Sequence, residues 1–195
     1  MHLPVEFTVV PRNRVARNLL SKSRGPLFRS MISIGDPGSR YPTGYRTVPA
    51  TIRIECADVS DPSDPLGPTR HDVSQIIGFA RTIARLGGRC LIHCEAGISR
   101  STAAAAIVAR VLLGAGSEAD VVAHVKALVP DARPNRLMIA FADDLIPDCH
   151  LAQALAGEPP SANLKGGLAA ASEEPAAQQA VAADGAGPGL WYTTV

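Results

Sequence analysis

Aromatic residues are scarce in this chain of 195 residues, at 4%, whereas hydrophobic residues make up an ordinary 46%. The core is therefore expected to consist mainly of aliphatic side chains and alanine. No apolar run approaches the ~20 residues that a membrane-spanning helix needs. The N-terminus also lacks the apolar segment and cleavage site of a signal peptide. These absences predict a protein that neither enters a membrane nor is exported.

Charge and cysteine content exclude further classes of protein. The formal net charge is only +1, so a nucleic-acid-binding protein driven by bulk electrostatics is not expected. The four cysteines form no zinc-like pair, and they indicate a reducing compartment. No metal and no organic cofactor is expected. Arginines in the acid-poor segment 12–29 resemble an organellar transit peptide, but strands predicted in the same region favour the cytoplasm.

One short segment, residues 93–101, holds most of the reactive groups and reads HCEAGISRS. An apolar strand is predicted just before it, and an alanine-rich helix from Arg100 to about Leu113 just after it. This order directs backbone N–H groups and the positive end of the helix dipole at the loop, where they favour a thiolate at Cys94. The planar guanidinium of Arg100 can bind two phosphate oxygens at once. The segment is therefore predicted to be a phosphate-binding loop that carries a nucleophile.

Strands and helices alternate along the chain, which predicts an α/β fold with a central, mostly parallel sheet flanked by helices. The phosphate-binding loop would then connect a strand to a helix. One domain is expected over residues 1–150, followed by a disordered tail rich in Ala, Gly and Pro over residues 151–195. Strands are expected near 7–10, 31–34, 52–56 and 89–93, and helices near 12–20, 69–86, 100–113, 118–128 and 134–146.

Three helix starts can be predicted from residue types alone. Thr69 and Asp72 form an acidic variant of the capping box, and Ser117 is expected to cap the helix that follows the alanine-rich one. Pro134 is expected at the first position of the last helix.

The segment 93–101 resembles the signature of the protein tyrosine phosphatases, and in particular that of the dual-specificity phosphatases. Two other segments match the family in the same order. An alternating strand over 51–58 ends in Asp58, and the run VKALVP at 125–130 is followed by Pro134 and Asn135. The resemblance covers roughly residues 48–146, and it implies a cysteine-dependent phosphatase.

The resemblance implies roles for the residues of the loop. Cys94 is the nucleophile, and Arg100 binds the phosphate together with the loop amides. Asp58 protonates the leaving oxygen and then activates water. Ser101 assists release of the cysteine from the phosphoenzyme, with Thr102 as a less favoured substitute. The substrate-binding residues are Glu95, Ala96, Gly97, Ile98, Ser99 and Arg100.

Supporting roles and alternatives follow from the same comparison. His93 is expected to order the loop by hydrogen bonding, and Asn135 to support the site without touching substrate. Asp61 and Asp64 lie on the same proline-rich segment as Asp58, so each remains an alternative general acid.

The predicted function is a protein phosphatase that acts on phosphotyrosine in a protein or peptide, with phosphoserine and phosphothreonine as further candidates. A phosphatase for a phosphoinositide, nucleotide or RNA ester uses the same chemistry and remains an alternative. A sulfurtransferase, an arsenate reductase and a phospho-binding module are less favoured. A regulatory disulfide between Cys94 and Cys56 or Cys90 also stays open. The natural substrate and the oligomeric state are not predicted.

Overall fold

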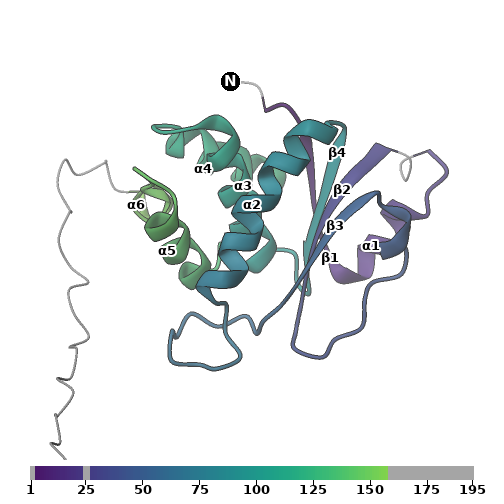
Figure 1. Ribbon diagram of the computed structural model, residues 1–195, viewed down its shortest axis with the longest axis horizontal. Coiled ribbons are helices and arrows are strands. Elements are labelled where there is room, and N and C mark those ends of the chain that lie inside the picture. The colour runs from purple at the N-terminus through teal and green to yellow at the C-terminus, as the bar shows by residue number, and fades with distance from the viewer. Residues whose placement is uncertain (1–2, 24–26, 158–195) are drawn as a thin grey trace, which may run out of the picture. The chain divides into compact units, whose positions relative to one another are not determined.

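The structure, a computed structural model, describes residues 3–23 and 27–157. Figure 1 shows a single sheet with helices on both of its faces, which confirms the predicted α/β class. The strands are β1 (Glu6–Pro11), β2 (Phe28–Gly35), β3 (Ala50–Glu55) and β4 (Arg89–Cys94). The helices are α1 (Arg12–Leu19), the short η2 (Tyr45–Thr47), α2 (Arg70–Leu86), α3 (Arg100–Leu113), α4 (Glu118–Leu128), α5 (Arg136–Leu145) and α6 (Leu151–Ala156).

The sheet is parallel throughout, in the order β1-β4-β2-β3. Strand β4 therefore has a neighbour on each side, and the register pairs its last residue, Cys94, with Pro11 at the end of β1. Parallel strands all end at the same edge, where ligands of open α/β sheets bind. The predicted phosphate-binding loop emerges at that edge.

Helices cover the two faces of the sheet unequally. In Figure 1, α1 lies on one face and α2 to α6 lie on the other. Because side chains alternate along a strand, Met31 and Leu91 pack with α1, whereas Ile32 and Ile92 join the larger cluster beneath α2 and α3. Both faces are thus covered mainly by aliphatic side chains and alanine, as the scarcity of aromatic residues predicts, and each cluster includes one buried phenylalanine, Phe7 or Phe28.

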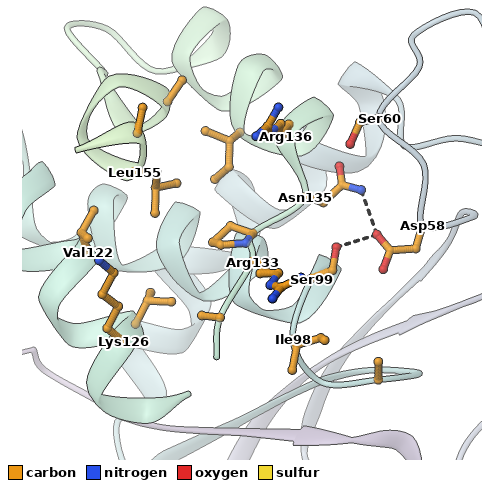
Figure 2. Close-up of a pocket in the computed structure, with 17 residues that line it drawn as sticks. Asp58, Ser60, Ile98, Ser99, Val122, Lys126, Arg133, Asn135, Arg136 and Leu155 are labelled. Carbon is orange, nitrogen blue, oxygen red and sulfur yellow. Dashed lines mark hydrogen bonds between the residues drawn. The ribbon is translucent and has the colours of Figure 1, made fainter. Parts of the chain in front are cut away.

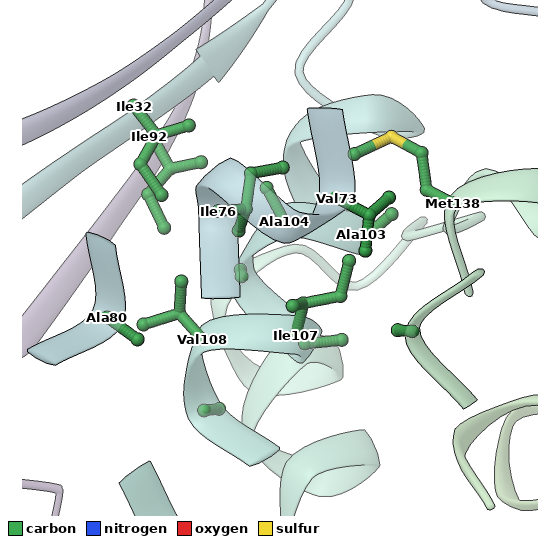
Figure 3. Close-up of a cluster of buried hydrophobic side chains, with 14 of the residues drawn as sticks. Ile32, Val73, Ile76, Ala80, Ile92, Ala103, Ala104, Ile107, Val108 and Met138 are labelled. Atoms are coloured by element: carbon green, nitrogen blue, oxygen red, sulfur yellow. The ribbon is translucent and has the colours of Figure 1, made fainter. Parts of the chain in front are cut away.

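Helix α3 is the buried centre of the larger layer. Every residue from Arg100 to Arg110 is buried, including the run of four alanines at 103–106. Such small side chains let neighbouring elements approach the helix closely, and alanine is also the best helix former. Figure 3 shows Ile76 of α2 beside Ala104, and Ile92 of β4 beside Ile32, in the same buried cluster. The packing fixes the N-terminus of α3, and with it the position of Arg100.

Helix starts agree with the sequence in one case and differ in two. The capping box is present: Thr69 Oγ1 accepts from the Asp72 amide, and the Asp72 carboxylate accepts from Thr69. The prediction for Ser117 is wrong, because its hydroxyl donates backward to the Gly114 carbonyl instead of capping α4. Pro134 lies outside α5, because the Asn135 side chain caps that helix by accepting from the Met138 amide at 3.1 Å.

The described body extends beyond the boundary expected at residue 150. Helix α6 follows that position, and Leu151 is buried in the core. Its backbone N–H donates to Asp143 of α5 at 2.8 Å, which fixes the start of α6. The disordered tail predicted for 151–195 lies outside the described residues from residue 158 onward.

Candidate active site

The loop that the sequence predicts to bind phosphate spans residues 95–99, between the end of β4 at Cys94 and the start of α3 at Arg100. It curls around the buried Cys94 sulfur. The Gly97 amide donates to Cys94 Sγ at 3.2 Å, and Ser101 Oγ lies 3.2 Å from the same sulfur. A backbone donor and the positive end of a helix dipole both favour negative charge on that sulfur.

The loop rests against the junction of β1 and α1. The Arg12 amide donates to the Glu95 carbonyl at 3.1 Å, and the Arg12 guanidinium pairs with the Glu95 carboxylate at 3.1 Å. Gly97 has a φ of +77°, and a Cβ placed there would lie 2.6 Å from the Pro11 nitrogen. Both the backbone conformation and the lack of space therefore require glycine at this position.

Gly97→Ala should lower the free energy of unfolding by about 2–5 kcal/mol, because it adds left-handed strain to a backbone clash. Gly116→Ala is the matched control, since Gly116 has a φ of +79° but nothing within 4 Å of the added Cβ. That control should cost only about 1–2 kcal/mol. Urea denaturation measures both, and equal losses would mean that the loop does not press on Pro11.

Arg100 is held by groups from two other segments. Its side chain is 3% exposed, and Nη1 donates to Asp36 Oδ1 at 2.8 Å and to the Cys56 carbonyl. Burial opposes the charge, but the hydrogen bond to Asp36 and the nearby Asp58 carboxylate together raise the pKa of Arg100. Its buried Nε donates no hydrogen bond within the described part of the chain. The guanidinium is thus fixed and charged, with one N–H still available to a ligand.

Asp58 lies over the loop, as Figure 2 shows. Its Oδ1 accepts from Ser99 Oγ at 2.6 Å and from Asn135 Nδ2 at 2.9 Å, and its Oδ2 is 3.8 Å from Arg100 Nε. Asn135 also donates to the Val59 carbonyl at 2.9 Å. The amide thereby links the Asp58 segment to the start of α5.

The alternative acids are engaged in local turns. Asp61 Oδ1 accepts from the Ser63 amide and hydroxyl, which lowers the pKa of Asp61, and Asp64 Oδ1 accepts from the Leu66 amide. Neither carboxylate forms a hydrogen bond or ion pair with the loop among the residues described. Of the three carboxylates on this segment, the structure brings Asp58 to the loop.

The two hydroxyls after Arg100 point in different directions. Ser101 faces the Cys94 sulfur, whereas Thr102 Oγ1 donates to the carbonyls of Ile98 and Ser99 at 2.7 and 2.8 Å. Only Ser101 of this pair is placed to exchange a proton with the sulfur. Thr102 instead closes the first turn of α3.

His93 is fully buried and lies behind the loop. Its Nε2 is 2.8 Å from Ser33 Oγ, which accepts from Arg53 Nη1 at 2.9 Å. A carbonyl oxygen can only accept, so Nδ1 carries the proton and donates to the Cys94 carbonyl at 3.4 Å, and Nε2 of the neutral ring accepts from the Ser33 hydroxyl. Burial lowers the pKa of His93 to about 4. The neutral ring thus holds the backbone of Cys94 and does not act as its base.

This low pKa has a consequence for stability. The unfolded chain binds a proton at His93 below pH 6.5, whereas the folded protein does so only near pH 4. Stability from this group is complete above pH 6.5 and is lost as the pH falls toward 4, with a total of about 3 kcal/mol. In urea titrations, the free energy of unfolding should therefore fall less for His93→Gln than for the parent between pH 6.5 and pH 4. Equal pH slopes would contradict a buried, neutral His93.

The remaining cysteines are free, buried thiols. Burial raises the pKa of Cys56 to about 11 and that of Cys90 and Cys149 to about 12. Cys94 is also free. Within the described ranges, no cluster of His, Cys, Asp or Glu is suited to a metal ion, and no helix is long and apolar enough to cross a membrane.

Sequence reasoning missed three contacts of this site. Asp36 follows β2 in a Gly-Asp-Pro-Gly stretch that predicts only a turn. Ser99 is predicted as a substrate-binding residue but not as a partner of Asp58, and Ser33 is predicted only as part of a strand. Each of the three residues contacts a partner more than 40 positions away in the sequence. Only the Asp36 contact had a signal in the sequence, because Asp36 follows directly after a buried strand.

No protein-family model matches the sequence. Human dual specificity protein phosphatase 15 is 37% identical over 84 residues, which cover 43% of this chain and 26% of that protein. The match thus spans about a quarter of the length of this relative.

Solved structures support the same fold. The crystal structure of human DUSP28 aligns with a TM-score of 0.55 at 19% identity, covering 77% of this chain and 94% of that one. A crystal structure of DUSP15 aligns with a TM-score of 0.53 at 24% identity, covering 78% and 96%. At these identities, the matches show that the chain shares its fold with DUSP28 and DUSP15.

Proposed function

We propose that this protein is a phosphatase that hydrolyses phosphotyrosine in proteins, and also phosphoserine or phosphothreonine, through a phosphocysteine intermediate. The observation that carries the proposal is the convergence at one loop of Cys94 Sγ, the Asp58 carboxyl group and the Arg100 Nε–H, which donates no hydrogen bond to a described residue. A nucleophile, an anion binder and a proton donor are the three groups that phosphoryl transfer through a covalent intermediate needs.

In the first step, the Cys94 thiolate attacks phosphorus while the bond from phosphorus to the ester oxygen breaks. Arg100 and the amides of residues 95–100 bind the equatorial oxygens, on which negative charge is spread. Asp58 in its acid form gives its proton to the departing oxygen. The products of this step are the free alcohol or phenol and an S-phosphorylated Cys94.

In the second step, Asp58 as a carboxylate accepts a proton from water, and that water attacks phosphorus. The phosphorus–sulfur bond breaks and inorganic phosphate leaves. Ser101 Oγ, 3.2 Å from the sulfur, stabilises the departing thiolate by donating a hydrogen bond.

The competing activities fit the contacts less well. Persulfide transfer needs no proton donor such as the Asp58 carboxyl group. A phospho-binding module needs no nucleophile such as Cys94 in the loop. The loop segment 95–99 carries Glu95 and no basic residue, which disfavours a polyanionic inositol headgroup.

A substrate panel tests the proposal. Phosphotyrosine, phosphoserine and phosphothreonine peptides, soluble phosphoinositides and nucleotides are assayed for phosphate release, with Cys94→Ser as the control. The expected result is Cys94-dependent release from phosphotyrosine peptides at the highest kcat/KM. Faster release from a phosphoinositide or nucleotide would show that this ester, and not a phosphoprotein, is the preferred substrate class.

We further infer a cytoplasmic location, because four free cysteines suit a reducing compartment. Alkylation of unreduced cell extracts should label all four thiols after denaturation. A cysteine that is labelled only after reduction would contradict this location.

A further inference from the structure

A cavity of about 890 Å³ lies beside the phosphate-binding loop. Asp58, Ile98 and Ser99 line one end of it, and helices α4, α5 and α6 line the rest, as Figure 2 shows. Neither Cys94 nor Arg100 is among its lining residues. The cavity therefore adjoins the place where the phosphate is attacked, but it is separate from the phosphate position itself.

The cavity is attached to the loop through the backbone. The Arg133 amide donates to the Ile98 carbonyl at 2.8 Å, and the Asn135 amide donates to the Ser99 carbonyl at 3.4 Å. Segment 133–136 thus runs from the outer side of the loop into the wall of the cavity. A group bound there is held at a fixed position relative to Cys94.

Part of the cavity surface is apolar. Val122 and Val125 of α4, Ile139 of α5 and Leu155 of α6 contribute to it. Each square ångström of apolar surface that a ligand covers here gains about 25 cal/mol. An apolar side chain therefore fits this part, whereas an inositol ring, which is polar all round, does not.

Three cations surround this apolar part: Lys126, Arg133 and Arg136. All three are exposed, and none forms an ion pair with a carboxylate in the residues that the structure describes. Asp58 is the one acidic residue in the described lining, and it is already bonded to Ser99 and Asn135. The cavity thus carries positive charge that the described protein does not neutralise.

We propose that this cavity is a subsite for a second anionic group of a phosphoprotein substrate. The phosphorylated residue enters the loop, an apolar side chain of the same polypeptide covers the apolar part, and a neighbouring glutamate, aspartate or phosphorylated residue meets the three cations. This inference rests on the proposed function, because it assumes that a phosphoester is bound at Cys94. It adds that the substrate carries a second negative charge close to that ester.

The test uses phosphotyrosine peptides of one sequence with neutral flanks, with a glutamate, or with a second phosphate. The extra charge is placed about two to four residues from the phosphotyrosine, at ~3.3 Å per residue. Charge reversal in Lys126→Glu/Arg133→Glu is compared with Arg81→Glu. Arg81 is exposed on α2, lies outside the cavity and forms no ion pair with a described residue.

The parent should hydrolyse the best doubly anionic peptide with a kcat/KM at least about tenfold above that of the neutral peptide. The ratio should fall to about one in the double variant and persist in Arg81→Glu. A ratio near one in the parent, or an unchanged ratio in the double variant, would overturn the subsite. If the double variant lost turnover on phosphoinositide vesicles but not on peptides, the cations would bind a lipid headgroup. That result would also overturn the subsite.

Binding separates this inference from the proposed function. Calorimetry with Cys94→Ser protein measures the affinity of the same peptides without turnover. Preferential binding of the doubly anionic peptide, lost on charge reversal, supports the subsite even if the parent releases no phosphate. Absence of phosphate release from every peptide would contradict the proposed function alone, whereas equal affinities would contradict the subsite alone.

Discussion

Replacing Cys94 with serine should reduce kcat on any phosphate ester by at least about a thousandfold, which corresponds to about 4 kcal/mol of barrier. A serine hydroxyl is far less ionised than a thiol, and the contacts of the loop are arranged around a sulfur. The Gly97 amide and Arg100 remain in place in this variant. It should therefore still bind phosphate or vanadate, which calorimetry measures alongside the loss of rate.

A second cysteine provides the matched control. Cys149 is also a free, buried thiol, and it lies between α5 and α6, outside the loop. Cys149→Ser should keep the rate within a few-fold of the parent. If Cys94→Ser retained a tenth or more of the parent rate, Cys94 would not be the nucleophile.

Replacing Asp58 with asparagine should slow hydrolysis of phosphotyrosine by roughly 10²–10⁴, the usual size of a general-acid contribution. Asparagine can still accept from Ser99 and Asn135 through its carbonyl oxygen, so the local structure is kept while the proton is lost. A phenol or serine oxygen needs that proton to leave. A nitrophenolate hardly needs it, so an activated aryl phosphate should be slowed much less.

Asp61→Asn and Asp64→Asn are the controls for this assignment. Both carboxylates accept hydrogen bonds from their own turns. Each variant should stay within a few-fold of the parent on both substrates. A larger loss in either one than in Asp58→Asn would move the general acid to that residue.

Much of the fold could be predicted because its signals are local. The alternation of 51–58, the Thr69–Asp72 capping box and the alanine-rich run before Leu113 each depend on neighbours along the chain. The cysteine loop could be located for the same reason, since strand, loop and helix follow one another directly. These segments agree with the structure in position and type.

The remaining features depend on contacts between distant segments. The pairing of Asp36 with Arg100 and that of Ser33 with His93 exist because β2 lies beside β4, and no spacing in the sequence encodes this order. Ser117 is a residue type that often caps helices, yet its hydroxyl donates to the Gly114 carbonyl and does not cap α4. Helix α6 is short, and its place depends on the Asp143 carboxylate that receives its first amides.

The central claim is that catalysis proceeds through a phosphorylated Cys94, and trapping that species tests it most directly. Parent and Ser101→Ala protein are mixed with a phosphotyrosine peptide, quenched within the first turnover, digested and analysed by mass spectrometry. The predicted result is one phosphoryl group on the peptide that contains Cys94, at higher occupancy in Ser101→Ala, because that variant lacks the hydroxyl beside the departing sulfur. A phosphoryl group on any other residue, or none during turnover in both proteins, would contradict the mechanism.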